Sequence, residues 1–271
     1  MDTYDQPECK YTFFGRITLI ETKKICNFAP EIFKILTDMN IAVLLAGGSG
    51  TRMGAGQPKQ FIEVAGRCVL EHSIRAFHSH PNIDEIVIIS HADHIDRVQE
   101  ISASYHKVQH ILPGGKERYD STLAALSAYS NMTDQETDQI CLLIHDAVRP
   151  MVSHRIITDC LCALQQYNAV DVAIATTDTI IEVNEQEHIC RIPLRSTLRN
   201  VQTPQCFRYK TIAEAYKRGL QDPNFVTTDD CGVVHKYLPE EPIYVVRGET
   251  TNVKLTYPED LLLAERLLKE K

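Results

Sequence analysis

The chain has 271 residues, enough for one large domain or two small ones, and its shares of 44% apolar and 24% charged residues are ordinary for a globular protein. A net charge of −8 argues against a nucleic-acid binder, which usually presents a basic face, so an anionic ligand needs a local cluster of positive charge. No apolar run approaches the roughly 20 residues of a membrane-spanning helix, and acidic residues replace the basic start of a signal peptide. The nine scattered cysteines favour reduced thiols, so we predict a cytoplasmic protein with no nucleic-acid or membrane partner.

Residues 1–40 do not share the pattern of the rest of the chain. They contain helix-like and strand-like fragments without a place in the alternation that follows, and Met39 stands directly before the first strong strand. We therefore predict an N-terminal extension over residues 1–40, either loosely attached or translated from a start codon assigned too early. One domain over residues 41–271 follows it.

Short apolar runs alternate with amphipathic stretches from residue 41 onward. Runs of four to six residues rich in Val and Ile are typical of strands covered on both faces, and apolar residues on one helical face are typical of helices packed on a sheet. The pattern predicts an α/β fold, a mostly parallel, Rossmann-like sheet with helices on both faces. The predicted strands are 41–46, 86–90, 141–145, 170–175 and 243–246, and clear helical stretches are 69–78, 121–129 and 154–167.

A hairpin signal interrupts this alternation. Residues 178–183 and 190–194 both look extended, and the polar stretch 184–188 between them is typical of a turn. We predict a β-hairpin arm inserted at about 176–203, which is either a local flap or an arm that contacts another subunit.

The glycine-rich segment LLAGGSGTRMGAGQPKQF, residues 44–61, is the strongest local signal. It follows an apolar strand, and its glycines allow backbone N–H groups to approach an anion closely. A dinucleotide fingerprint is excluded because Met53 takes the third glycine position, and a Walker loop is excluded because Pro58 precedes Lys59. What remains is a glycine loop with two cations, Arg52 and Lys59, and its alternative is a plain turn with solvated charges.

This segment resembles the signature of nucleotidyltransferases that activate sugars, and most of all the cytidylyltransferases that act on polyol phosphates. The resemblance runs from about residue 41 to the C-terminus, and residues 1–40 have no counterpart in it. It implies a fold of the nucleotide-diphospho-sugar transferase type and transfer of a cytidylyl group from CTP to a small polyol phosphate, with release of pyrophosphate. Six further segments match in order: GGKERYDS (114–121), HDAVRP (145–150), TDTI (177–180), QTPQ (202–205), TTDD (227–230) and NVKLTYPED (252–260).

The reaction that the resemblance implies depends on cations more than on a general base. A phosphate monoester has a second pKa of about 6, so it is already an anion at neutral pH and can attack the α-phosphorus of CTP directly. Positioning two polyanions and stabilising charge at phosphorus then become the main tasks. By resemblance, the catalytic cations are Arg52, Lys59 and Lys254, and the triphosphate is cradled by Ala46, Gly47, Gly48 and Gly50.

The segment HDAVRP supplies the expected metal site. An aspartate at the carboxyl end of a strand is well placed to hold Mg²⁺, which prefers carboxylate and phosphate oxygens. By resemblance, Asp146 lies near Mg²⁺ and the ribose, Ala147 contacts the substrate, and Arg149 lies near the acceptor phosphate. The alternative for Asp146 is a cap on the helix that follows.

The segment GGKERYDS would form the cytosine pocket. By resemblance, the backbone of Gly114 and Gly115 approaches the base edge, Ser121 adds a hydroxyl group, and Arg118 organises the loop. The alternative makes the two glycines a turn and Ser121 a helix cap.

The arm carries the remaining expected site residues. By resemblance, it mediates a homodimer, Thr179 and Thr203 line the acceptor site, and Arg195 reaches the site of the partner subunit. The alternative for Arg195 is a solvated side chain. Asp229 and Asp230 brace the site.

Two acceptors remain open within the family. One branch uses D-ribitol 5-phosphate and another uses 2-C-methyl-D-erythritol 4-phosphate in isoprenoid precursor synthesis. Three segments favour the ribitol branch: HRII after HDAVRP, NAVDVAIATTDTI, and IPLR before QTPQ. Two other classes are a non-catalytic nucleotide-binding regulator, which the joint presence of Arg52, Lys59, Asp146 and Lys254 opposes, and a nicotinamide-dependent oxidoreductase, which the glycine spacing opposes.

Overall fold

The computed structural model describes residues 38–48 and 57–270. Residues 1–37, which are most of the expected extension, and Gly50 and Arg52 of the glycine loop lie outside the described residues. Within the described ranges, no helix combines the length and the hydrophobicity that a membrane crossing requires.

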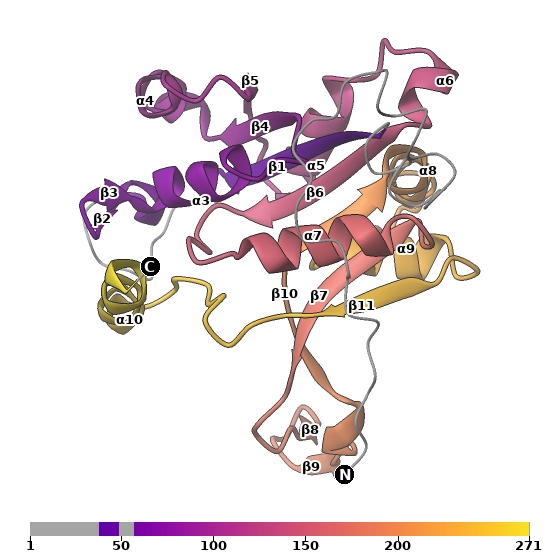
Figure 1. Cartoon of the computed structure of the whole chain (residues 1–271). Helices are drawn as coiled ribbons and strands as arrows, with labels where there is room; N and C mark the ends of the chain where they lie inside the picture. The colour runs from indigo at the N-terminus through magenta and orange to yellow at the C-terminus, as the bar shows by residue number, and fades with distance from the viewer. Residues whose placement is uncertain (1–37, 49–56, 271) are drawn as a thin grey trace, which may run out of the picture.

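A seven-stranded sheet forms the centre of the molecule (Figure 1). Its spatial order is β11-β7-β10-β6-β1-β4-β5, and neighbours pair in parallel except at β10, which is antiparallel to both β6 and β7. The predicted mostly parallel α/β fold is thereby confirmed. The strands are β1 (Met39–Ala46), β4 (Glu85–Ser90), β5 (Val108–Pro113), β6 (Ile140–Asp146), β7 (Ala169–Ala175), β10 (Arg199–Arg208) and β11 (Ile243–Arg247).

Helices cover both faces of this sheet, and an apolar core lies on each side. Phe77 and Ile156 belong to the core on one face, and Tyr216 and Val234 belong to the core on the other. Each large apolar side chain that is fully buried contributes about 1.5–3 kcal/mol of transfer free energy, so the two cores hold the helices on the sheet. The helices are α3 (Val69–His78), α4 (Ile95–Ser102), α5 (Arg118–Ser127), α6 (Asp134–Thr137), α7 (His154–Ala163), α8 (Tyr209–Gly219), α9 (Asp230–Tyr237) and α10 (Pro258–Lys269).

Helix α7 begins where the sequence predicts and ends earlier. The Ser153 side chain accepts a hydrogen bond from the backbone of Ile156 and caps the first turn. Beyond Ala163 the helix gives way to a turn in which Gln165 and Gln166 make i→i−3 hydrogen bonds, so the expected stretch 154–167 is only partly helical.

The apolar runs predict β1, β4, β6, β7 and β11 but not β5 or β10. Strand β10 has little of that apolar pattern. It reads RNVQTPQCFR, yet residues 202–208 are buried. Its pairing with β7 shifts register between Gln202 and Cys206, and Pro204 lies in that irregular stretch, where a strand tolerates a residue without an N–H group. Buried polar side chains thus replace the apolar signal in this strand.

The expected hairpin consists of β8 (Glu182–Val183) and β9 (Ile189–Arg191), which are antiparallel and shorter than the extended runs in the sequence. It projects beyond the ends of β7 and β10 (Figure 1). Six of its large apolar side chains are 42–70% exposed, and a two-stranded hairpin of this size is marginal by itself in water. The six are Ile180, Ile181, Val183, Ile189, Ile192 and Leu194.

Asp171 places a carboxylate in the middle of β7. Its Oδ1 accepts hydrogen bonds from Gln205 Nε2 (3.2 Å) and from the backbone of Val172 (2.9 Å). Burial raises the pKa of Asp171 to about 6, and the neighbouring carboxylate of Asp229 acts in the same direction. The native state therefore holds this proton to a higher pH than the unfolded chain does, so the parent protein loses stability as the pH rises from about 4 to about 6.

We expect Asp171→Asn to remove this loss, because the amide keeps an acceptor oxygen and cannot ionise. At pH 8 the variant's free energy of unfolding should exceed that of the parent by about 1–3 kcal/mol, and the two should converge near pH 4. Urea titrations at both pH values measure the difference. As a control, Asp222→Asn should show the opposite sign, because the hydrogen bond from Tyr237 lowers the pKa of Asp222. An Asp171→Asn variant that is less stable than the parent by the same amount at every pH would contradict this account.

Candidate functional site

The loops that follow β1, β5 and β6 meet at the carboxyl edge of the sheet. The last residues of β1 pair with β6, so Leu45 lies opposite Asp146, and the backbone of Ala147 donates to the carbonyl of Leu45 at 3.1 Å. Gly47 and Gly48 therefore follow directly beside Asp146. The Gly114 backbone donates to the carbonyl of Ser90 (2.8 Å), at the end of β4. In open α/β sheets this edge is where ligands bind.

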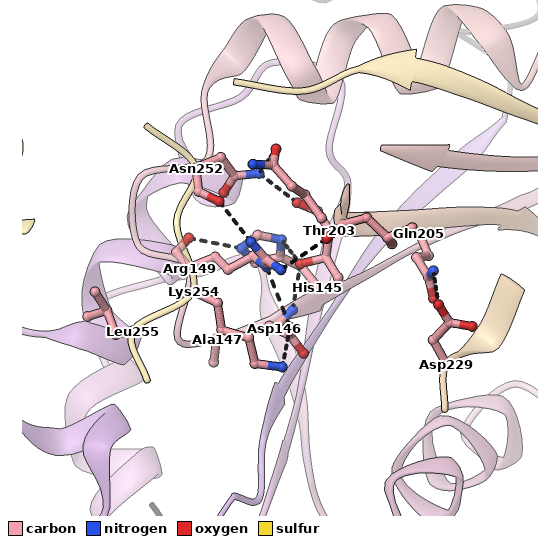
Figure 2. Close-up of polar contacts among 12 residues, drawn as sticks. His145, Asp146, Ala147, Arg149, Thr203, Gln205, Asp229, Asn252, Lys254 and Leu255 are labelled. Atoms are coloured by element: carbon pink, nitrogen blue, oxygen red, sulfur yellow. Dashed lines mark hydrogen bonds and ion pairs between the residues drawn. The ribbon is translucent and has the colours of Figure 1, made fainter. Parts of the chain in front are cut away.

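The carboxylate of Asp146 is the centre of a charged cluster (Figure 2). Its Oδ2 lies 2.9 Å from Nζ of Lys254 and 3.5 Å from Nε of Arg149. Burial alone would raise the pKa of Asp146, but Lys254 first and then Arg149 and Arg118 lower it below its ordinary value, so the group stays ionised. The helix that follows is capped by Ser153, so capping is not the role of Asp146.

The C-terminal segment joins Lys59 to this cluster. Nζ of Lys59 donates to the carbonyl of Leu255 at 3.1 Å, and the backbone of Leu255 donates to the carbonyl of Val148 at 2.9 Å. The next residue, Gln60, donates from Nε2 to the carbonyl of Ala46 at 2.7 Å. These hydrogen bonds bring Lys59 and Lys254, which are far apart in the sequence, to the same edge of the sheet as Asp146.

A network of neutral groups holds the charged ones in place (Figure 2). The Arg149 Nη1 donates to the carbonyl of Asn252 (2.8 Å), and Asn252 Nδ2 donates to the carbonyl of Thr203 (2.9 Å). His145 lies between Thr203 and Arg149, and full burial lowers the pKa of His145 to about 4. Sequence reasoning did not assign roles to His145 and Asn252, although both stand inside matched segments.

The Gly114–Gly115 loop has no room for side chains. A Cβ on Gly114 would lie 2.8 Å from Ser121 Oγ, and one on Gly115 would collide with the side chain of Asp120. Ser121 is buried inside the first turns of α5, and the cap of that helix is Glu117 in a capping box with Asp120. Ser121 is therefore not the helix cap of the alternative interpretation.

Asp230 supports the GGKERYDS segment through an ion pair with Arg118. Its fully buried carboxylate pairs with Arg118 Nη1 at 2.8 Å and accepts hydrogen bonds from Thr122 (2.8 Å) and Tyr216 (2.6 Å). Burial alone would lower the pKa of Arg118, but the charge of Asp230 raises it above its ordinary value. The bracing role expected for Asp230 thus has a structural basis in the Arg118 ion pair.

Gln205 links β10 to the start of α9, where Asp230 lies. Its Oε1 accepts from the backbone of Asp230 (3.0 Å), and its Nε2 donates to Asp229 Oδ2 at 3.0 Å (Figure 2). Asp229 is the N-cap of α9, with its side chain accepting from the backbone of Gly232. The segments QTPQ and TTDD are therefore in direct contact.

Two expected site residues lie on the arm and not in this cluster. Within the described residues, Thr179 and Arg195 make no hydrogen bond or ion pair with the groups around Asp146. Arg195 Nη1 donates to the carbonyl of Thr177 at 3.1 Å, and both side chains are exposed. Thr203, by contrast, lies in the cluster, where its hydroxyl oxygen accepts from the backbone of Asp146 at 3.1 Å.

No group of three or more His, Cys, Asp or Glu side chains in the described ranges is arranged to hold a metal ion. A metal at this edge would need oxygen ligands from the substrate as well as from Asp146.

Comparisons with known proteins agree with this geometry. The family model of 2-C-methyl-D-erythritol 4-phosphate cytidylyltransferase matches residues 40–270. The 2-C-methyl-D-erythritol 4-phosphate cytidylyltransferase of Thermobifida fusca is 45% identical over 234 residues, which are 84% of this chain and 92% of that protein. A bifunctional ribulose 5-phosphate reductase/CDP-ribitol pyrophosphorylase of Haemophilus influenzae is 44% identical over 235 residues, which are 86% of this chain and 48% of that protein.

The fold is similar to solved structures of the same kind. The crystal structure of 4-diphosphocytidyl-2C-methyl-D-erythritol synthase from Anaerococcus prevotii has a TM-score of 0.76 and 30% identity, covering 87% of this chain and 98% of that one. For 2-C-methyl-D-erythritol 4-phosphate cytidylyltransferase from Thermus thermophilus the TM-score is 0.66 at 28% identity.

The ion pair between the partly exposed Arg118 and the fully buried Asp230 gives a prediction about stability. Asp230→Ala leaves the Arg118 guanidinium without its carboxylate and the hydroxyls of Thr122 and Tyr216 without their acceptor, so the free energy of unfolding should fall by about 3 kcal/mol. The control is Asp138→Ala, which breaks an exposed pair with Lys210 of the same 2.8 Å length and should cost less than about 1 kcal/mol. Urea unfolding measures both. Equal losses of unfolding free energy in the two variants would mean that the burial of Asp230 does not make its ion pair more important than an exposed one.

Proposed function

We propose that this chain, which belongs to the 2-C-methyl-D-erythritol 4-phosphate cytidylyltransferase family, transfers a cytidylyl group from CTP to 2-C-methyl-D-erythritol 4-phosphate. As a member of this family the chain is a nucleotidyltransferase that uses CTP. The observation that carries the choice of acceptor is the Thermobifida fusca relative, whose similarity extends over 92% of its length. This reverses the preference for ribitol 5-phosphate from the sequence, because the segments behind that preference are mostly packing residues.

D-ribitol 5-phosphate is the second candidate acceptor. It is supported by the Haemophilus influenzae relative, which carries the name CDP-ribitol pyrophosphorylase and is 44% identical. That protein is bifunctional and this chain matches 48% of it, so the similarity supports the ribitol acceptor less directly.

The cluster around Asp146 suits such a transfer. An oxygen of the acceptor phosphate forms a bond to the α-phosphorus of CTP, the bond from that phosphorus to the bridging oxygen breaks, and pyrophosphate leaves with the electron pair. Lys59 and Lys254 would stabilise the charge that develops at phosphorus, and Arg149 would bind the acceptor phosphate. Arg52 joins the cations in this proposal on the resemblance alone.

Gly47, Gly48, Gly114 and Gly115 would form the backbone surfaces for CTP. The Gly114–Gly115 loop supports this proposal because it excludes side chains beside the buried Ser121, so a flat base could approach the backbone. Ala46 and Ala147, at the ends of β1 and β6, would flank the triphosphate and the ribose.

Asp146 would hold Mg²⁺ together with the triphosphate. Mg²⁺ commonly binds one or two carboxylates plus substrate phosphates, and Asp146 is an ionised carboxylate at the ligand-binding edge. When bound, the ion would neutralise charge on the phosphates.

The arm would complete the site in a homodimer. Its exposed isoleucines need cover, and closed twofold pairing is the commonest soluble assembly. Since Thr179 and Arg195 project with the arm and make no contact with the cluster in their own described chain, a partner subunit is where they would meet an acceptor.

The reaction is tested with purified enzyme, CTP and each acceptor in turn, with release of pyrophosphate as the measurement. We expect 2-C-methyl-D-erythritol 4-phosphate to give the higher kcat/KM, and excess chelator to abolish turnover. A higher kcat/KM for D-ribitol 5-phosphate would transfer the assignment to the second candidate. Binding of CTP without pyrophosphate release with either acceptor would make the chain a regulator.

Lys59→Ala should lower kcat by about a hundredfold or more, on the order of 3 kcal/mol of lost charge stabilisation. The KM of CTP should change less than kcat does, because the transition state carries more charge at phosphorus. Lys217→Ala is the control, since it removes an exposed lysine on α8. A Lys59→Ala enzyme with near-parental turnover would refute the role given to Lys59.

Arg195→Ala should raise the KM of the acceptor far more than that of CTP, because the lost contact is a charge-assisted one to the acceptor phosphate. Mixing Arg195→Ala with Lys59→Ala should restore part of the activity, since mixed dimers contain one site with neither change. The control mixture uses Arg191→Ala, which removes an exposed arm cation paired with Glu182. If the subunits exchange and the mixture of Arg195→Ala with Lys59→Ala regains no activity, the model of a site shared between subunits is wrong.

A further inference from the structure

The imidazole of His145 bridges two segments of the site at the end of β6 (Figure 2). The ring is fully buried, with Nε2 3.1 Å from the carbonyl oxygen of Arg149 and Nδ1 3.0 Å from the hydroxyl oxygen of Thr203. Its flank packs against Phe77, with ring centroids 5.1 Å apart. Each nitrogen makes one of these two hydrogen bonds, so the chemistry of the bonded partners assigns the role of each nitrogen.

The partner of Nε2 fixes the tautomer. A carbonyl oxygen can only accept a hydrogen bond, so Nε2 carries the proton and donates it to Arg149. In a neutral imidazole the other nitrogen is then an acceptor, so the Thr203 hydroxyl donates its proton to Nδ1. The same hydroxyl oxygen accepts the backbone N–H of Asp146 at 3.1 Å. The backbone N–H of Asp146 can only donate, so the state of His145 sets the direction of the other hydrogen bond of the Thr203 hydroxyl.

These hydrogen bonds hold both ends of the turn that follows β6. The backbone of Asp146 is tied to β10 through Thr203, and the carbonyl of Arg149 is tied to Nε2 of His145. The Arg149 backbone also donates to the carbonyl of Asp146 at 3.0 Å, which closes the turn on itself. One buried ring thus fixes the backbone positions from which a carboxylate and a guanidinium extend.

We propose that His145 is a positioning residue, whose Nε2–H tautomer holds the turn with Asp146 and Arg149 against Thr203 and so sets where the acceptor is bound. The inference rests on the proposed function, in which Arg149 meets the acceptor phosphate. It also gives Thr203 a defined role. With its proton directed to Nδ1, Thr203 offers a substrate only a lone pair, which suits a hydroxyl group of a polyol and not a phosphate oxygen.

The kinetic test compares Thr203→Val, which keeps the shape and removes the hydroxyl, with Thr203→Ser, which keeps the hydroxyl. We expect Thr203→Val and His145→Gln each to raise the KM of the acceptor about tenfold, with a smaller change for CTP, since displacement of a positioned group by about 1 Å is enough. Thr203→Ser, which keeps the hydroxyl, should recover most of the acceptor affinity that Thr203→Val loses. The KM of the acceptor for the double variant, with both His145→Gln and Thr203→Val, should be no higher than for either single variant, because both changes break the same chain of contacts. Equal rises for acceptor and CTP, or multiplied effects in the double variant, would overturn the proposal.

A spectroscopic test separates this inference from the proposed reaction. Long-range ¹H–¹⁵N spectra of the full chain, assigned through His145→Gln or through the Thr203 variants if that variant does not fold, should show a protonated Nε2 and an unprotonated Nδ1. The Nδ1 signal should move in Thr203→Val and stay in Thr203→Ser. A protonated Nδ1 would overturn the inference even in an active enzyme. If the parent turned over neither acceptor while these signals were as expected, the proposed function alone would fail.

Discussion

Attraction between the Asp146 carboxylate and the cations around it is the interaction on which the site depends. Lys254 and Arg149 both contact one oxygen of this group, and Arg118 lies close enough to lower its pKa further. Cations brought together to bind two polyanions repel one another, and two unit charges about 4 Å apart interact by about 4 kcal/mol at an effective dielectric constant of about 20. A buried carboxylate in their midst offsets that repulsion. A chain with a net charge of −8 can in this way carry a concentrated positive site.

Sheet topology explains why segments distant in sequence supply this cluster. Parallel strands end at the same edge, so the residues after β1, β5 and β6 meet there. Strand β10 runs the other way, which means that its beginning and not its end reaches this edge, and Thr203 lies beside Asp146. Asn252 then ties the C-terminal segment to β10, and Lys254 follows two residues later. Opposite strand direction is therefore what allows β10 to meet the turn after β6.

The sequence was sufficient for the sheet, most strand positions, the hairpin and the family, because buried strands and glycine loops leave strong local patterns. It was not sufficient for β5, whose residues are only partly buried or exposed, or for β10, whose buried residues include Gln202, Thr203 and Gln205. Nor did it reveal His145 and Asn252 as parts of the site, since hydrogen bonds to backbone carbonyls leave no spacing signal. The arm residues Thr179 and Arg195 were predicted by resemblance, and in the structure of one chain they stand apart from the cluster.

The polar character of β10 follows from what it connects. Gln205 contacts the carboxylates of β7 and of the α9 start, and Gln202 accepts from the backbone of Glu249 while donating to its carbonyl. An apolar strand would bury more surface, but apolar contacts are non-directional and tolerate small shifts. A buried amide with designated partners does not, because leaving a donor or acceptor unpaired costs about 1–3 kcal/mol. Hydrogen bonds in the centre of the sheet thus give the site its precision, and the same feature removes the apolar pattern by which a strand is predicted.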